Sequence, residues 1–147
     1  MVKRWKFTTI HPRAKIGKGT TIGNFCEIGP VKIGKDVSIQ AFVFIPAWVT
    51  IQDSVFIGPG VVFTNDKRPP SYGKYWGKTL VKKGASIGAN ATILPGITIG
   101  KKSIIGAGST VTKDVPDGET WIGWPAHKIK CHFKKDIKFG KGKKDQK

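Results

Sequence analysis

The stretch "VKKGASIGANATILPGITIGKKSIIGAGSTV", from Val81 to Val111, repeats one pattern every six residues. Each unit begins with an aliphatic residue, often continues with glycine, and has a small or β-branched residue four positions after the first. The pattern extends back to the N-terminal region, where its leading residues are Ile10, Ile16, Ile22, Ile28, Ile33, Ile39, Ile45, Ile51, Ile57 and Phe63. A short period sustained over this length is the sequence signature of a solenoid.

Each hexad is expected to form a short strand followed by a sharp bend. The glycine after the leading residue is expected to supply the backbone conformation of that bend. One hexad cannot bury its leading residue alone, so successive coils must stack and share a continuous core. Three hexads, or 18 residues, would close one triangular coil. The predicted ladders are Ile16, Ile33, Ile51, Val81 and Ile99; Ile22, Ile39, Ile57, Ile87 and Ile105; and Ile28, Ile45, Phe63, Ile93 and Val111.

The repeat departs from its period at two places. The unit "IGPVK", Ile28 to Lys32, is one residue short, which requires a local adjustment but keeps the phase. The larger departure lies between Phe63 and Val81, which are 18 residues apart where a plain repeat would use six. We therefore predict that about residues 64–80 form a loop inserted at one corner of the solenoid, and that this loop recognises a ligand.

Length and charge limit the remaining possibilities. A chain of 147 residues suits one domain, here predicted as residues 1–130 followed by a basic tail at residues 131–147. The formal charge of +17 and the isoelectric point near 10.1 favour polyanionic partners, such as nucleic acid, a membrane surface or phosphorylated small molecules.

The cysteines and the apolar segments indicate neither a disulfide framework nor a membrane anchor. Cys26 and Cys131 are far apart and have no neighbouring Cys or His in a metal-binding spacing. The N-terminal segment has no apolar core of signal-peptide length, and no run approaches the roughly 20 residues of a membrane span. A cytoplasmic protein is the expectation.

The sequence resembles the hexapeptide-repeat acyltransferases over about residues 10–128. This resemblance implies an all-β fold, a left-handed parallel β-helix of hexapeptide repeats with one inserted loop and a basic C-terminal tail. The handedness is implied only by the resemblance, because general connection rules favour right-handed crossovers. Members of this family include acyltransferases, zinc-dependent carbonic anhydrases and structural subunits, so the residues of the site must decide the function.

The positions of the histidines separate these alternatives. His11 lies in the first coil, and His127 and His132 lie beyond the last hexad. A carbonic anhydrase would need three histidines around zinc, and a hydroxyl acceptor would need a histidine base near the loop. An amine acceptor needs only to be positioned and to lose a proton once it has attacked.

The stretch "FTND" at the start of the loop, followed by Trp76 and Thr79 in a W-x-x-T spacing, is similar to the nucleotide-sugar 3-amino N-acetyltransferases. The resemblance implies transfer of acetyl from acetyl-CoA to an aminosugar carried on UDP or dTDP, for surface polysaccharide assembly. No metal is expected. The sequence leaves open the base, the sugar and the position of the amine.

The resemblance places the acceptor beside the loop. Asn65 matches the residue beside the sugar amine, although an asparagine that only forms a turn would look the same. Asp66 could bind or deprotonate the ammonium, or it could pair with a neighbouring cation. The diphosphate and the base are expected to meet residues of the loop, namely Lys67, Arg68 and Lys74 for the diphosphate and Tyr72, Tyr75 and Trp76 for the base or the sugar. Each of these has an alternative as a solvated charge or as an aromatic anchor at an interface.

The resemblance also implies that coenzyme A lies along a groove between two prisms of a homotrimer, so that each site lies between subunits; closed cyclic symmetry is compatible with such an interface. The matching small bends are Gly88 and Ala89, then Gly106 and Ala107. Positions matching contacts with the coenzyme phosphates or the adenine are Lys113, Pro125, Ala126 and Lys128. All of the small residues could equally be ordinary corner residues of the solenoid.

Two alternative functions remain. The chain could acylate a free sugar or a small amine. It could instead be a non-catalytic β-helix that binds nucleic acid or another acidic polymer through its basic surface. Nucleic acid is not the expected partner, because the basic residues are spread over the bends and do not form one stripe with stacking aromatics.

Overall fold

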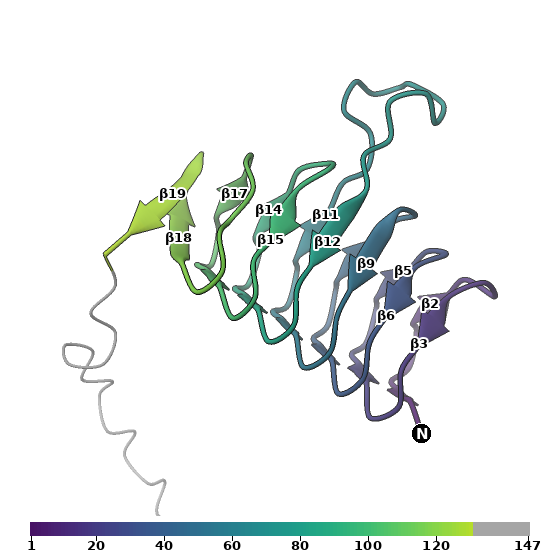
Figure 1. Cartoon of the computed structure of the whole chain (residues 1–147). Helices are drawn as coiled ribbons and strands as arrows, with labels where there is room; N and C mark the ends of the chain where they lie inside the picture. The colour runs from purple at the N-terminus through teal and green to yellow at the C-terminus, as the bar shows by residue number, and fades with distance from the viewer. Residues whose placement is uncertain (131–147) are drawn as a thin grey trace, which may run out of the picture.

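The computed structural model describes residues 1–130. The predicted basic tail, residues 131–147, lies outside the described residues, together with Cys131 and His132. The described residues form a parallel β-helix of about seven coils, which confirms the expected all-β, left-handed fold. Figure 1 shows the coils stacked in chain order, with one loop projecting from their side. No helix in this part of the chain is long and apolar enough to cross a membrane.

The strands form three sheets, one on each side of the prism. Sheet A contains β1 (Lys3–Arg4), β4 (Thr21–Ile22), β7 (Ser38–Ile39), β10 (Phe56–Ile57), β13 (Ser86–Ile87), β16 (Ile104–Ile105), β18 (Thr120–Gly123) and β19 (Ala126–Ile129). Sheet B contains β2 (Thr9–Ile10), β5 (Glu27–Ile28), β8 (Phe44–Ile45), β11 (Val62–Phe63), β14 (Thr92–Ile93) and β17 (Thr110–Val111). Sheet C contains β3 (Lys15–Ile16), β6 (Lys32–Ile33), β9 (Val49–Ile51), β12 (Thr79–Val81) and β15 (Thr98–Ile99).

The three predicted ladders are confirmed. In sheet C, Ile33 pairs in parallel register with Ile16 and Ile51, and Val81 pairs with Ile51 and Ile99. The corresponding leading residues also stack strand upon strand in sheets A and B. Leading residues from Ile22 to Val111 are almost fully buried, and the small corner residues between them complete the core. The 18-residue period therefore determines the length of one regular coil.

The glycine that follows the leading residue has a different role from the one expected. Gly23 has no positive φ; the left-handed conformation falls two residues later, for example at Phe25 (φ 56°). Glycine is needed after the leading residue because the next coil comes very close. A Cβ on Gly23 would lie 2.6 Å from the backbone nitrogen of Ala41, and similar close approaches occur at Gly58 and Gly88.

Replacing Gly23 with alanine should therefore destabilise the stack. The added methyl group meets backbone and cannot be accommodated by moving a side chain, so we expect a loss of about 2–3 kcal/mol in the free energy of unfolding. Gly118→Ala is the control, because Gly118 has a φ of 71° but open space around it. That variant should lose only about 1 kcal/mol through its left-handed backbone. Equal losses in urea denaturation would contradict the close-approach explanation.

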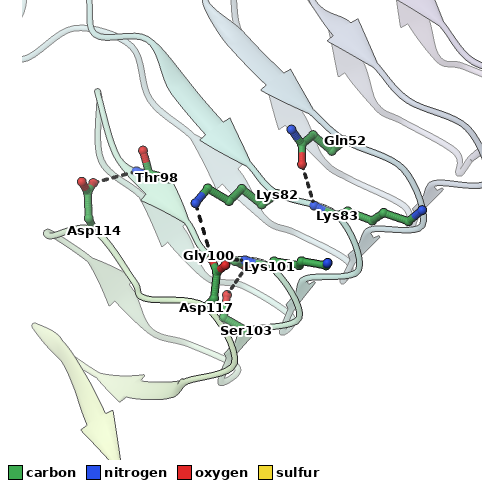
Figure 2. A network of polar contacts seen from close by, with 9 residues as sticks. All are labelled: Gln52, Lys82, Lys83, Thr98, Gly100, Lys101, Ser103, Asp114 and Asp117. Atoms are coloured by element: carbon green, nitrogen blue, oxygen red, sulfur yellow. Dashed lines mark hydrogen bonds and ion pairs between the residues drawn. The ribbon is translucent and has the colours of Figure 1, made fainter.

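Side chains tie neighbouring coils together at the corner between sheets C and A (Figure 2). The backbone N–H of Lys101 donates to Asp117 Oδ1 (2.7 Å), which also accepts from Lys82 Nζ (3.4 Å). The backbone N–H of Lys83 donates to Gln52 Oε1 (2.9 Å). The backbone hydrogen bond from Lys101, followed by the charge of Lys82, holds the pKa of Asp117 below its usual value. Carboxylate and amide caps thus satisfy backbone donors that the bends leave free.

The corner between sheets A and B carries an exposed aromatic stack in the first three coils. The rings of Phe7 and Phe25 are 5.2 Å apart between centroids, and those of Phe25 and Phe42 are 5.1 Å apart, with interplanar angles of 8° and 9°. All three phenylalanines have a left-handed backbone. The stack gives part of this corner a regular apolar surface.

The C-terminal end of the prism is closed differently from the rest. β18 continues sheet A in parallel with β16, but β19 turns back and pairs antiparallel with β18. Glu119 stabilises this hairpin, since its carboxylate accepts hydrogen bonds from Lys128 Nζ (2.6 Å) and Trp121 Nε1 (2.8 Å). These bonds, that of Lys128 first, lower the pKa of Glu119.

Candidate active site

The inserted loop leaves the prism at the corner between sheets B and C, after β11 and before β12 (Figure 1). It runs from residue 64 to residue 78, slightly shorter than expected, because β12 already begins at Thr79. Its two ends pair with each other. The N–H of Gly77 donates to the carbonyl of Asn65 (2.8 Å), Asp66 and Trp76 form an antiparallel bridge, and the N–H of Lys67 donates to the carbonyl of Tyr75 (3.2 Å). The loop is therefore a short hairpin whose stem is fixed to the prism.

Asn65 lies in this stem, at the surface of the prism, and is half-buried. Its backbone carbonyl is used in the stem, but its side chain is only weakly held. The amide Nδ2 donates to the carbonyl of Ala47 at 3.5 Å, at the limit of a hydrogen bond. The stem thus fixes the position of Asn65 and leaves most of the hydrogen-bonding capacity of its amide for a ligand.

Asp66 has both carboxylate oxygens engaged within the loop. Oδ1 accepts from the N–H of Arg68 (3.0 Å), and Oδ2 accepts from the N–H of Ser71 (2.8 Å). Partial desolvation raises the pKa of Asp66. The hydrogen bonds from Ser71 and Arg68 together lower it by more, so the pKa lies below its ordinary value. A carboxylate with a low pKa is a weak base near neutral pH. The geometry therefore favours a role for Asp66 in holding the loop.

A pH profile can test this role. Because the pKa of Asp66 is lowered in the folded loop, its contribution to the stability of the folded state is complete above pH 3.8, the ordinary pKa of the group. This contribution is lost only as the pH falls through the lower folded pKa. We therefore expect Asp66→Asn to raise the KM for the acceptor about 10-fold, through the lost hydrogen bond, without altering the shape of the kcat profile between about pH 6 and pH 9. Loss of a titration from that profile would identify Asp66 as the base.

The other predicted residues of the loop lie mostly on its outer part. Arg68 and Lys74 both lie over the ring of Tyr75, at 5.4 Å and 5.2 Å from its centroid. Tyr72 is 94% exposed. Lys67 is exposed as well, on the stem. Of the predicted acceptor residues of the loop, Trp76 lines a cavity beside it.

That cavity has a volume of about 840 Å³ and lies on the N-terminal side of the loop. Its lining includes small or aliphatic residues and Thr50, namely Pro30, Val31, Ala47, Val49 and Thr50. It also includes two tryptophans and three basic side chains, which are Trp48, Trp76, Arg13, Lys32 and Lys78. Four of these five lie outside the predicted set. For Arg13, Lys32 and Trp48 the signal in the sequence was the short hexad, which we interpreted only as a local adjustment, whereas Lys78 lies at the end of the inserted loop.

The residues expected to meet coenzyme A are at another corner. Gly88 and Ala89 follow β13, and Gly106 and Ala107 follow β16, so both pairs lie one above the other at the corner between sheets A and B. The N–H groups of Gly88 and Gly106 donate to the carbonyls of Ile105 and Trp121 in the next coil. Within residues 1–130, those of Ala89 and Ala107 donate to no backbone acceptor. These amides remain available to a ligand, but one prism does not bring them to the Asn65 corner.

The last predicted positions are in and near the terminal hairpin. Lys113 follows β17 and is exposed. Pro125 is exposed in the turn of the β18–β19 hairpin, and Ala126 is buried beneath it. Lys128 is paired with Glu119, so a phosphate would have to compete with or share this carboxylate. Within residues 1–130, no group of three or more His, Cys, Asp or Glu side chains could hold a metal ion.

The stacked coils, the small corner residues and the single loop together define a hexapeptide β-helix protein. The family described as Bacterial transferase hexapeptide (six repeats) matches residues 30–65 and 78–113, on either side of the loop. The chain belongs to this family.

Curated relatives share the repeat over most of this chain. The bifunctional protein GlmU of Heliobacterium modesticaldum is 32% identical over 127 residues, covering 86% of this chain and 26% of the relative. GlmU of Aquifex aeolicus is 34% identical over 123 residues, covering 84% of this chain and 25% of the relative. The chain therefore spans about a quarter of the length of these relatives.

Solved structures share the fold. AntD, an N-acyltransferase from Bacillus cereus solved as a mutant with dTDP-4-amino-4,6-dideoxyglucose and coenzyme A, has a TM-score of 0.76 and 26% identity, covering 87% of this chain and 79% of that one. A hexapeptide-repeat acetyltransferase from Vibrio cholerae, complexed with acetyl coenzyme A, has a TM-score of 0.68 and 29% identity. The match covers 78% of this chain and 69% of that one. A GDP-perosamine N-acetyltransferase from Caulobacter crescentus, at 24% identity and a TM-score of 0.76, supports the fold alone.

Proposed function

We propose that this protein is an acetyl-CoA-dependent N-acetyltransferase whose acceptor is the amino group of a sugar linked to UDP or dTDP. The observation that carries the proposal is the weakly held amide of Asn65, whose hydrogen-bond partner, Ala47, lines a basic and aromatic cavity. Membership of the hexapeptide family supports acyl transfer, and the likeness to AntD, solved with a dTDP-linked aminosugar and coenzyme A, supports the acceptor class.

The proposed reaction needs few groups from the protein. The neutral amine nitrogen attacks the thioester carbonyl, a carbon–nitrogen bond forms, and the carbon–sulfur bond then breaks. The amine loses one proton and the coenzyme leaves as a thiol, so the products are an amide and free coenzyme A. In this proposal the amide of Asn65 accepts a hydrogen bond from the amine and directs its lone pair toward the carbonyl.

The thioester would lie along the corner of Gly88, Ala89, Gly106 and Ala107. The N–H of Ala107 or of Ala89 could donate to the carbonyl oxygen as it becomes negative, because neither has a backbone acceptor within residues 1–130. Lys113, Pro125, Ala126 and Lys128 remain the proposed contacts of the distal part of the coenzyme.

A homotrimer would complete the site. The Asn65 loop and the Ala107 corner lie at different corners of one prism, so a neighbouring subunit is needed to place an acceptor at one beside a thioester at the other. We accordingly propose a cytoplasmic trimer that modifies nucleotide-linked sugars for surface polysaccharide assembly.

An assay of thiol release from acetyl-CoA tests the function. The acceptors are UDP- and dTDP-linked 3-amino and 4-amino sugars, the corresponding free aminosugars, and simple amines. We expect release with at least one nucleotide-linked sugar and little with its free counterpart. Equal rates with a free sugar or a small amine would favour the alternative acyltransferase. No turnover with any acceptor, together with a melting shift caused by an oligonucleotide, would favour a polyanion-binding β-helix.

A further inference from the structure

The cavity beside the loop arises where the two departures from the repeat meet. Register between strands shows which residue the short hexad lacks. Lys32 pairs with Lys15 on one side and with Thr50 on the other, so these three positions are equivalent. Two residues before Lys15 is Arg13, and two before Thr50 is Trp48. In the short coil the corresponding corner residue is absent, and Pro30 joins Val31 directly.

The missing residue leaves a recess between its two neighbours. Arg13 and Trp48 stand on either side of the shortened corner, and Pro30 and Val31 also line the recess. The returning end of the loop, with Trp76 and Lys78, provides another wall. Neither departure alone would make this cavity, because the loop supplies a wall and the short hexad supplies the depth.

The charge of the recess indicates its ligand. Arg13, Lys32 and Lys78 all line it, and it has no acidic residue in its walls. The two ion pairs among residues 1–130 join Lys82 to Asp117 and Lys128 to Glu119, so none of the three cations of the cavity is paired within this part of the chain. Converging cations without a counter-ion favour an anion with several oxygens, such as a diphosphate.

The tryptophans add a surface for a planar group. Trp48 is 49% exposed, and Lys78 Nζ lies 5.3 Å from the centroid of its ring. Aromatic faces of this kind stack with nucleobases of any sequence. Trp48 also has a φ of 74°, whereas Gly96 occupies the equivalent corner of a later coil with a φ of 80°. A bulky residue in this conformation carries local backbone strain that glycine would avoid.

The recess adjoins the proposed catalytic corner through one residue. Ala47 lines the recess, and the carbonyl of Ala47 is the acceptor of the Asn65 side chain. The Asn65 amide therefore lies one hydrogen bond from a residue of the recess, close enough for one ligand to reach both. The volume of about 840 Å³ lies within the range of about 300–1,000 Å³ that small-molecule sites occupy.

We propose that this recess binds the nucleoside diphosphate end of the acceptor. The diphosphate lies among Arg13, Lys32 and Lys78, and the base stacks on Trp48 or Trp76. The identity of the acceptor rests on the proposed function, whereas the binding of a nucleoside diphosphate does not. The diphosphate contacts are thereby assigned mainly to Arg13 and Lys32 of the prism and to Lys78 at the base of the loop. They are not assigned to Lys67 on the stem, or to Arg68 and Lys74 on the outer part of the loop.

Calorimetric titration of the full-length protein with dTDP and with UDP tests the proposal. We expect Arg13→Gln and Trp48→Gly each to raise the Kd of the preferred nucleotide at least about 10-fold. Trp48→Gly removes the ring and leaves a residue suited to the left-handed corner, so the variant should fold with an unchanged or higher Tm. Arg4→Gln, which removes a similar exposed charge from sheet A, and Phe42→Gly, which removes an exposed corner aromatic with a φ of 61°, are the matched controls.

The outcomes separate this proposal from the proposed function. If neither variant changes the Kd by more than about twofold, or if Arg4→Gln weakens binding as much as Arg13→Gln, the recess is not the nucleotide site. If nucleotide binding depends on Arg13 and Trp48 but no aminosugar is acetylated, the recess is correctly assigned and the acyltransferase proposal fails. If a nucleotide-linked sugar is acetylated with a KM that Arg13→Gln leaves unchanged, the acyltransferase stands and the recess proposal fails.

Discussion

Replacing Asn65 with alanine is expected to lower the kcat for acetyl transfer by about 100-fold or more. The expected size comes from the loss of one positioned polar group in the transition state, which typically costs 10²–10³ in rate. The variant keeps the backbone hydrogen bond between Asn65 and Gly77, so the stem of the loop should remain in place. Steady-state kinetics with the best acceptor from the thiol-release assay provides the measurement.

The stability of the same variant distinguishes catalysis from folding. Within residues 1–130, the one side-chain hydrogen bond that alanine removes is the 3.5 Å bond to the carbonyl of Ala47, so the Tm should stay within about 2 °C of the parent. Asn24→Ala, at an exposed corner of an earlier coil, is the matched control and should retain full activity. An unchanged kcat for Asn65→Ala would remove this residue from the mechanism. A fall in kcat accompanied by an equal loss of folded protein would make its role structural.

Replacing Phe63 with alanine should cause the largest loss of stability. Phe63 is fully buried and is the largest of the fully buried side chains, in a ladder of otherwise aliphatic residues. Removal of a buried phenylalanine costs about 3–5 kcal/mol, because the lost transfer energy adds to the cavity that remains. At about 2–4 °C per kcal/mol for a domain of this size, the Tm should fall by roughly 6–20 °C. Scanning calorimetry at matched protein concentration measures this directly.

Val62→Ala is the control for the preceding prediction. Val62 belongs to the same strand, but its side chain points outward and is 36% exposed. Its truncation should change the free energy of unfolding by less than about 1 kcal/mol. Similar losses for Val62→Ala and Phe63→Ala would mean that the ladder does not carry the stability of the coils.

The coil and its register could be predicted because a solenoid uses the same contacts repeatedly. Each leading residue meets its equivalent 18 residues away, 17 away across the short hexad or 30 away across the inserted loop. The plain and shortened spacings placed Ile33 between Ile16 and Ile51. The reason for the glycines could not be predicted in the same way. Distances between neighbouring coils, such as that from Gly23 to Ala41, depend on how closely the sheets stack, and periodicity contains no such distance.

The cavity was harder to predict than the loop. An insertion of charged and aromatic residues is visible in the sequence, and it does project from the prism. A deletion of one residue shows only as a shorter spacing, and its effect appears when the neighbouring corners are stacked around it. Arg13, Lys32 and Trp48 are separated in the sequence, so only the 18-residue coil brings them to one recess. The partners of Asp66 were also hidden, because they depend on the path of the loop.

The antiparallel hairpin at the C-terminal end has a consequence for the size of the particle. Stacked parallel coils expose unpaired strand edges at both ends, and such edges can template the addition of another molecule. In sheet A, β19 occupies that edge in the reverse direction, so another prism cannot add to this sheet in the direction of its other strands. The opposite end carries Lys3, Arg4 and Lys15 on two-residue strands, and such short, charged edges disfavour pairing with any added strand. Both ends therefore oppose head-to-tail growth into filaments, and the protein can present its side faces to partners while remaining a discrete particle.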